Sequence, residues 1–80
     1  MKIKQLEDGT FVGDFQGIDG SYLELLVKNF LLKLKEDTIA KIIMDDPNTH
    51  LDVIMYINNL GCEILQNKLK KGTFSIKLRR

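Results

Sequence analysis

Cysteine is nearly absent from this 80-residue sequence, which contains only Cys62. A single cysteine cannot form a disulfide within the chain, and it supplies no cysteine cluster for a metal ion. The sequence also lacks an apolar run approaching the roughly 18 residues of a membrane span, and it does not begin with the apolar stretch of a secretory signal. We therefore expect a cytoplasmic protein with no membrane-spanning segment, no metal and no cofactor.

Charge of one sign is not in large excess either. The chain has 12 lysine and arginine residues and 11 acidic residues, which gives a formal net charge of +1. The overall charge therefore does not attract a polyanionic partner. Hydrophobic residues make up 44% of the sequence, which is enough for a single core. Residues 1–80 are interpreted as one small domain.

The second half of the chain contains the clearest pattern. Residues 39–44 form an apolar run rich in β-branched side chains, which predicts a buried strand. Pro47 cannot donate a ladder hydrogen bond and disfavours helical geometry at the preceding residue, so the strand should end there. Thr49 is then placed to cap an amphipathic helix over residues 49–60, and Gly61 suits the left-handed position after it.

A first helix is predicted over residues 21–34. Ser21 to Glu24 match the capping box S-x-x-E, so Ser21 is the expected N-cap. The apolar arc of this helix is wide, because Tyr22, Leu25 and Leu32 extend it. Such an arc favours a helix covered on two sides. An oligomer formed through this helix is therefore one of the alternatives.

Short β-prone segments occur at both ends of the chain. Residues 1–6 and 10–15 are candidates for a hairpin across Asp8-Gly9, and Gly13 suggests a bulge there.

A second hairpin is predicted from residues 62–69 and 73–78. In its last strand Phe74, Ile76 and Leu78 alternate toward the core. In the strand before it, one face is expected to hold Cys62 and Ile64, and the other Leu65 and Leu69.

The predicted order of elements is β-α-β-α-β-β, with an additional N-terminal strand left open. Such a chain should form a two-layer α/β sandwich, in which both helices lie on one face of a mixed four-stranded sheet. The strands on either side of the first helix should be parallel. The final hairpin should be antiparallel.

Several motifs, taken in order, resemble the TusA/SirA-like sulfur-carrier family over about residues 10–79. Its strand-DDP-helix-G pattern is similar to Asp45-Asp46-Pro47 with Thr49, Asp52-Val53 and Leu60-Gly61. Its D-x-x-G-L loop before the first helix is similar to Asp14-Phe15-Gln16-Gly17-Ile18. The resemblance implies proteins that carry sulfur as a persulfide on the cysteine of a C-P-x-P motif. They receive it from a cysteine desulfurase or a related donor.

The decisive cysteine of that motif has no counterpart here. Continuing the match from Gly17 places the cysteine position on Gly20 and the first proline position on Ser21. A serine hydroxyl does not form a stable equivalent of a persulfide. The resemblance therefore implies the fold and a partner-binding loop formed by Gly17, Asp19, Gly20 and Ser21, and it does not imply the transfer activity. Anion binding by this loop is the alternative, and a simple turn with a cap is the preferred structural interpretation.

The remaining chemical candidates are weaker. Cys62 is the only thiol, and we expect it to be a small buried residue at the opposite end of the sheet from Gly20. Asp45 and Asp46 are interpreted as a helix-start feature rather than a catalytic or metal-binding pair. His50 has no partner at catalytic or ligand spacing and is expected to be a solvated helix residue.

The end of the chain is basic, with Lys70, Lys71, Arg79 and Arg80. These residues either contact nucleic acid or form a solvated edge that discourages strand pairing, and we favour the second interpretation. We do not expect nucleic acid as the partner.

Taken together, these patterns predict a non-catalytic TusA/SirA-like protein, a partner-binding or regulatory module associated with sulfur-relay proteins. The expected partner is a protein such as a cysteine desulfurase, and we do not expect an enzyme. Two alternatives stay open. One is a persulfide carrier that uses Cys62, and the other is a nucleic-acid-binding module that uses the basic hairpin.

Overall fold

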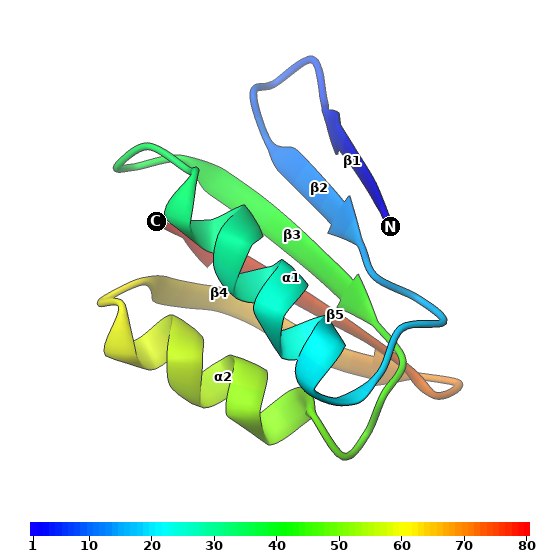
Figure 1. Cartoon of the computed structure of the whole chain (residues 1–80). Helices are drawn as coiled ribbons and strands as arrows, with labels where there is room; N and C mark the ends of the chain where they lie inside the picture. Colours follow the sequence, from blue (N-terminus) through cyan, green and yellow to red (C-terminus); the bar gives the residue numbers. More distant parts are fainter.

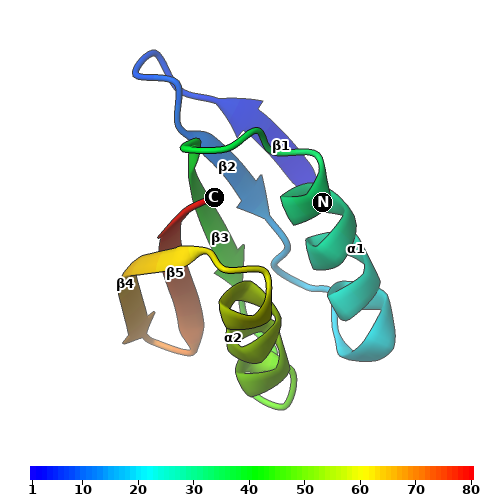
Figure 2. The same cartoon turned by 90° about the vertical axis from the view of Figure 1, so that its left-hand side faces the viewer.

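Two helices cover one face of a five-stranded sheet in the computed structural model, which describes all 80 residues (Figure 1). The elements are β1 (Lys2–Gln5), β2 (Phe11–Asp14), α1 (Gly20–Leu32), β3 (Ile39–Met44), α2 (His50–Asn59), β4 (Glu63–Lys70) and β5 (Thr73–Arg79). Figure 2 shows that both helices lie on the same side of the sheet and that no element covers the other side. This is the predicted two-layer sandwich, and β1 is the additional strand that the sequence left open.

The centre of the sheet is β3. The strand order is β1-β2-β3-β5-β4, so β3 pairs with β2 in parallel and with β5 in antiparallel orientation. Ala40, Ile42 and Met44 alternate toward the helices and are fully buried. Burying a side chain as large as Ile42 or Met44 stabilises the fold by about 1.5–3 kcal/mol. The prediction of a buried strand over residues 39–44 is confirmed, as are the parallel pair and the hairpin between β1 and β2.

Helix α1 begins one residue earlier than predicted, and its cap differs. Asp19 is the N-cap, and the first turn closes through a hydrogen bond from the Leu23 amide to the Asp19 carbonyl (3.2 Å). The prediction that Ser21 caps this helix is therefore wrong. The buried side chains of α1 are Leu23, Val27, Phe30 and Leu31. Tyr22, Leu25 and Leu32 extend the apolar arc as predicted and are exposed.

Helix α2 starts after Thr49, which is its N-cap as predicted, although the Thr49 side chain makes no capping bond. Val53 and Ile57 bury one face of the helix against the sheet. Gly61 follows with a φ of +80°, and its amide donates to the Asn58 carbonyl (3.0 Å), so the predicted left-handed position is confirmed. Neither helix of the fold is long and apolar enough to cross a membrane.

Gly13 does not mark a bulge, contrary to the prediction. It pairs regularly with Ile3 on one side and Ile42 on the other. A Cβ atom at this position would lie 2.6 Å from the Cε2 atom of Phe15. The ring of Phe15 packs edge-to-face on Phe30, with 5.7 Å between centroids. Glycine is needed here because an aromatic ring occupies the space of a side chain.

The bulge lies in β4 instead, at Leu65. The register passes from Ile64 opposite Leu78 directly to Gln66 opposite Lys77. This extra residue shifts the alternation, so Leu69 stands opposite Phe74 and faces the helix side. The prediction that Leu69 lies on the face opposite to Ile64 is therefore wrong.

Replacing Gly13 with alanine should destabilise the protein by about 1–3 kcal/mol, because the new methyl group overlaps the ring of Phe15. Urea unfolding of Gly13→Ala and of the wild type measures the difference. The matched background is Phe15→Leu, in which the ring is absent. If Gly13→Ala costs as much in that background, the ring contact is not the cause.

Candidate functional site

The loops that follow β2 and β3 are joined by Asp45. Its carboxylate accepts the amide hydrogen of Gly17 through both oxygens, at 3.0 and 3.2 Å. Gly17 has a φ of +82°, a conformation that glycine adopts without steric cost. The D-x-x-G loop and the Asp-Asp-Pro turn, which lie 28 residues apart in the sequence, therefore form one tied structure at this edge of the sheet.

Asp46 joins the starts of both helices. One oxygen accepts the Gly20 amide at the start of α1 (2.9 Å) and the Thr49 hydroxyl at the start of α2 (2.5 Å), and the other accepts the Asn48 amide (3.1 Å). The Thr49 hydroxyl bond, followed by the Gly20 and Asn48 amide bonds, holds the pKa of the Asp46 carboxyl below its ordinary value of 3.8. A carboxylate from a distant turn thus replaces the local capping box that the sequence suggested.

This arrangement limits what the loop can bind. A helix N-terminus attracts anions through its free amides, but the Gly20 amide already donates to Asp46. Asp19, Asp45 and Asp46 also line a shallow hollow of about 310 Å³ together with Gly17, Ile18 and Pro47. The hollow is acidic, so it suits a basic group of a partner rather than a phosphate or another anion.

Gly20 has no neighbour where a side chain would stand. Its φ is +60°, and a Cβ atom built on it would meet nothing within 4 Å. The position that the predicted resemblance matches to the sulfur-accepting cysteine is therefore on the surface, at the start of a helix. Ser21 lies beside it in the first turn and is exposed. The four residues predicted as a partner-binding loop lie in one continuous segment before and at the start of α1.

Cys62 lies elsewhere, as predicted. It follows the C-terminal end of α2, where its amide donates to the Ile57 carbonyl (3.2 Å), and it belongs to the buried core. Both helices begin at the same end of the sheet, and the chain reaches Cys62 at the other end (Figure 1). The only thiol is therefore neither exposed nor close to the Gly20 loop.

His50 is half-buried and contacts other side chains, so the prediction of a solvated helix residue is wrong. Its ring stacks on Phe74, with 4.0 Å between centroids, and its Nε2 atom lies 3.2 Å from Oδ1 of Asn67. The β4 bulge brings Asn67 to the helix side, opposite Ile76. The cluster joins the start of α2 to the β4–β5 hairpin. A periodicity argument that assumes a regular β4 cannot detect it.

The basic residues at the chain end do not form one surface. The Nε atom of Arg80 donates to the Leu31 carbonyl near the end of α1 (3.2 Å), on the helix side. Arg79 forms an ion pair with Glu63 across the strands (2.6 Å). Lys71 occupies the β4–β5 turn with a φ of +52°. Lys70, which precedes it in β4, pairs with Thr73. The predicted nucleic-acid contact through these four residues is therefore divided between two sides of the sheet.

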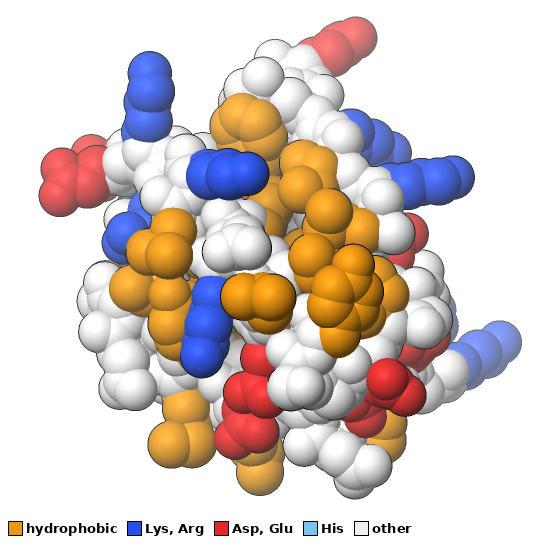
Figure 3. Space-filling model, in the orientation of Figure 1, with side chains coloured by type: hydrophobic (Ala, Val, Ile, Leu, Met, Phe, Trp, Pro, Cys, Tyr) orange, Lys and Arg blue, Asp and Glu red, His pale blue; other side chains and the backbone are white.

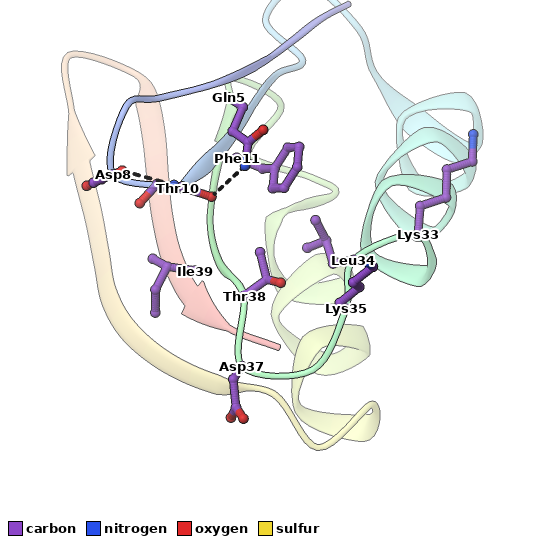
Figure 4. A pocket seen from close by; sticks show the side chains of 11 residues that line it. Gln5, Asp8, Thr10, Phe11, Lys33, Leu34, Lys35, Asp37, Thr38 and Ile39 are labelled. Atoms are coloured by element: carbon purple, nitrogen blue, oxygen red, sulfur yellow. Dashed lines mark hydrogen bonds between the residues drawn. The ribbon is translucent and has the colours of Figure 1, made fainter.

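Two other hollows are at least as large as the acidic one, and neither contains a predicted site residue. A polar cleft of about 440 Å³ lies between the β1–β2 hairpin and the segment that joins α1 to β3 (Figure 4). Its lining includes four charged residues, Asp8, Lys33, Lys35 and Asp37. An apolar groove of about 310 Å³ lies between β1 and α1, lined mainly by Met1, Ile3, Phe11, Leu26, Phe30 and Leu34.

The Asp46 carboxylate should make stability depend on pH. Its depressed folded-state pKa means that its contribution is present above pH 3.8 and is lost as the pH falls through the lower folded value. Asp46→Asn should therefore lower the Tm at pH 7, and its difference from the wild type should shrink below about pH 4. Thermal unfolding between pH 2.5 and 7 measures this. Thr49→Val, which removes the strongest donor, should show a weaker pH dependence than the wild type; an unchanged profile would contradict the assigned cause.

The fold and the tied loop are thus established for this chain independently of any relative. Comparison of the sequence with protein-family models gives no match, and comparison with curated proteins gives none either. The similarity of its motifs to the TusA/SirA-like family stays a prediction.

Proposed function

We propose that this protein is a non-catalytic, TusA/SirA-like module that binds a partner protein of a sulfur relay, such as a cysteine desulfurase. The observation that carries the proposal is the separation between the only thiol and the only loop built like the family's. Cys62 is buried behind the end of α2, whereas the loop at Gly20 is exposed, hydrogen-bonded to Asp45 and Asp46, and without a thiol. The proposed docking surface is therefore separate from the only group that could carry sulfur. The proposed setting is the cytoplasm.

The docking surface consists of the loop at Gly20 and the first turns of both helices. Tyr22 and Leu51 are 62% and 71% exposed there, although both are large apolar side chains. Acidic residues lie in the same part of the molecule: Asp19 lines the hollow beside the loop, and Glu24 and Asp52 line the groove between the helices together with Lys28. In Figure 3, hydrophobic side chains gather over the helices, and a group of acidic side chains lies toward the end where the helices begin.

This combination fits a partner with an apolar patch framed by basic residues. Aromatic side chains contribute most to such contacts, and surrounding charges mainly govern orientation and association rate. The two carboxylates that tie the loop keep its backbone in one arrangement, which lowers the conformational entropy lost on binding. A persulfide carrier that uses Cys62 gains no support from this geometry.

The first test measures sulfur transfer. The protein is incubated with a cysteine desulfurase and radiolabelled cysteine, and complex formation and reducible label are followed separately. We expect a complex without label for the wild type and for Cys62→Ser. Label on the wild type that is lost in Cys62→Ser would overturn the non-catalytic assignment, and absence of any complex would remove the link to the relay.

Gly20→Cys provides the positive control. The position is open to solvent, so a thiolate there can attack the outer sulfur of the desulfurase persulfide and release the desulfurase cysteine as a thiolate. The left-handed backbone costs a non-glycine residue about 1–2 kcal/mol, so folding is checked by circular dichroism. We expect this folded variant alone to become labelled.

The second test measures docking. Tyr22→Ala should weaken the complex about tenfold, or about 1.4 kcal/mol, because it removes an exposed aromatic anchor. Leu32→Ala is the matched control: it lies on the same helix, at its other end, and is 57% exposed. Isothermal titration calorimetry gives both affinities. Equal losses of affinity in the two variants would contradict the proposed surface. If the mass of the protein alone rises with its concentration, and either variant abolishes that rise, the result would instead indicate self-association through α1.

A further inference from the structure

The open face of the sheet, the side without helices, carries a row of lysines. Register places Lys4 opposite Val12, Val12 beside Lys41, and Lys41 opposite Lys77. Residues in register across a sheet point to the same face. The alternate residues of β3 and β5, such as Ile42 and Ile76, are buried under the helices, so this row faces away from them. Three lysines from β1, β3 and β5 thus lie in one line.

Neighbouring rows add further positive charge. The next row runs from Lys2 through Asp14, Ile43 and Ser75 to Lys68. The same alternation places Lys70 and Arg79 on this face. The open face therefore holds seven of the twelve cationic residues of the chain, drawn from four strands.

Negative charge on this face is sparse and already engaged. Glu63 is paired with Arg79, and Asp14 accepts the Gln16 amide (3.0 Å). Asp8 lies in the turn between β1 and β2, and the pKa of its carboxyl is lowered mainly by the hydrogen bonds from Thr10 and further by the charge of Lys77. The near-neutral total of the sequence therefore conceals a strongly basic surface.

The chemistry and shape of the face select among polyanions. The aromatic residues of the strands, Phe11 and Phe74, point to the helix side, so no ring is available to stack on an unpaired base. Lysine ammonium groups on flexible stems act as point charges toward phosphates. The face therefore suits the sugar–phosphate backbone of a nucleic-acid duplex and offers no group for recognising individual bases.

The width of the lysine row and the twist of the sheet also favour a duplex. Three strand spacings separate Lys4 from Lys77, which is about 14 Å, comparable to the roughly 12 Å major groove of B-form DNA. Adjacent strands rotate by about 20–25°, and β1 and β4 run in clearly different directions (Figure 2). A twisted face follows a cylinder better than the plane of a lipid bilayer, on which its rows would reach different depths.

We infer that the open face of the sheet binds duplex nucleic acid through its phosphates, without sequence preference, with Lys4, Lys41 and Lys77 as central contacts. This function is independent of the helix-side docking surface. The separate row on β1, β3 and β5 replaces the chain-end residues as the contact set. Binding of this kind is weak at physiological salt, with dissociation constants of about 10⁻⁴–10⁻⁶ M, and strengthens steeply as salt is lowered.

The test uses a fluorescent 24-base-pair DNA duplex of mixed sequence and measures anisotropy between about 25 and 200 mM salt. The logarithm of the association constant should fall linearly with the logarithm of salt concentration, with a slope of about −0.9 for each phosphate contacted. Lys4→Gln/Lys41→Gln/Lys77→Gln should make this slope shallower by nearly 3, and Lys77→Gln alone by nearly 1.

The matched control is Lys28→Gln/Lys33→Gln/Lys35→Gln, which removes the same charge from α1 and the loop after it. Its slope should stay within about 0.5 of the wild type. An equal change in both triple variants would show that only total charge matters and would overturn the inference, as would no binding at 25 mM salt. Tighter binding of polyglutamate, or of anionic phosphatidylserine vesicles, with the same dependence on the three lysines would assign the face to a different partner. Circular dichroism and the single Lys77→Gln variant separate loss of binding from loss of folding.

Discussion

The hydrogen bonds of the Asp46 carboxylate are the constraint on which the end of the molecule where both helices begin depends. One side chain accepts the Gly20 amide, the Asn48 amide and the Thr49 hydroxyl, so the turn after β3 is joined to the starts of both helices. The carboxylate also compensates the positive end of the α1 dipole from within the chain. The loop at Gly20 is consequently a hydrogen-bonded surface rather than an open anion site, and these bonds support the proposed docking role.

The parts of the fold that the sequence could predict are those governed by local periodicity. The strand over Ile39–Met44, the alternation of Phe74, Ile76 and Leu78, and the left-handed Gly61 each depend on side chains a few residues apart. Pro47 ended the strand for a reason intrinsic to its ring. These elements in turn decide the two-layer arrangement, because an apolar strand and two amphipathic helices can bury their surfaces in few ways.

The features that the sequence could not predict depend on contacts between residues that are distant in the chain. The side-chain acceptor for the first amide of α1 is Asp46, 26 residues beyond Gly20, so no local capping box could reveal it. One extra residue at Leu65 turned Leu69 and Asn67 to the helix side and gave His50 a partner that regular alternation denies it. The lysine row can be recognised only once the strand register is known. Of the candidate site, the sequence therefore located the loop and the buried thiol, but not the bonds that shape the loop or the open face.

The opposed charges of the two sides have a kinetic consequence. Carboxylates cluster where the helices begin, and ammonium groups cover the uncovered side of the sheet, so the molecule has a permanent electric dipole moment despite a formal net charge of +1. The field of a charged macromolecule exerts a torque on such a dipole within about 8 Å at physiological ionic strength. A charged partner therefore orients the protein before contact. Positively and negatively charged partners meet different sides of the same 80-residue chain.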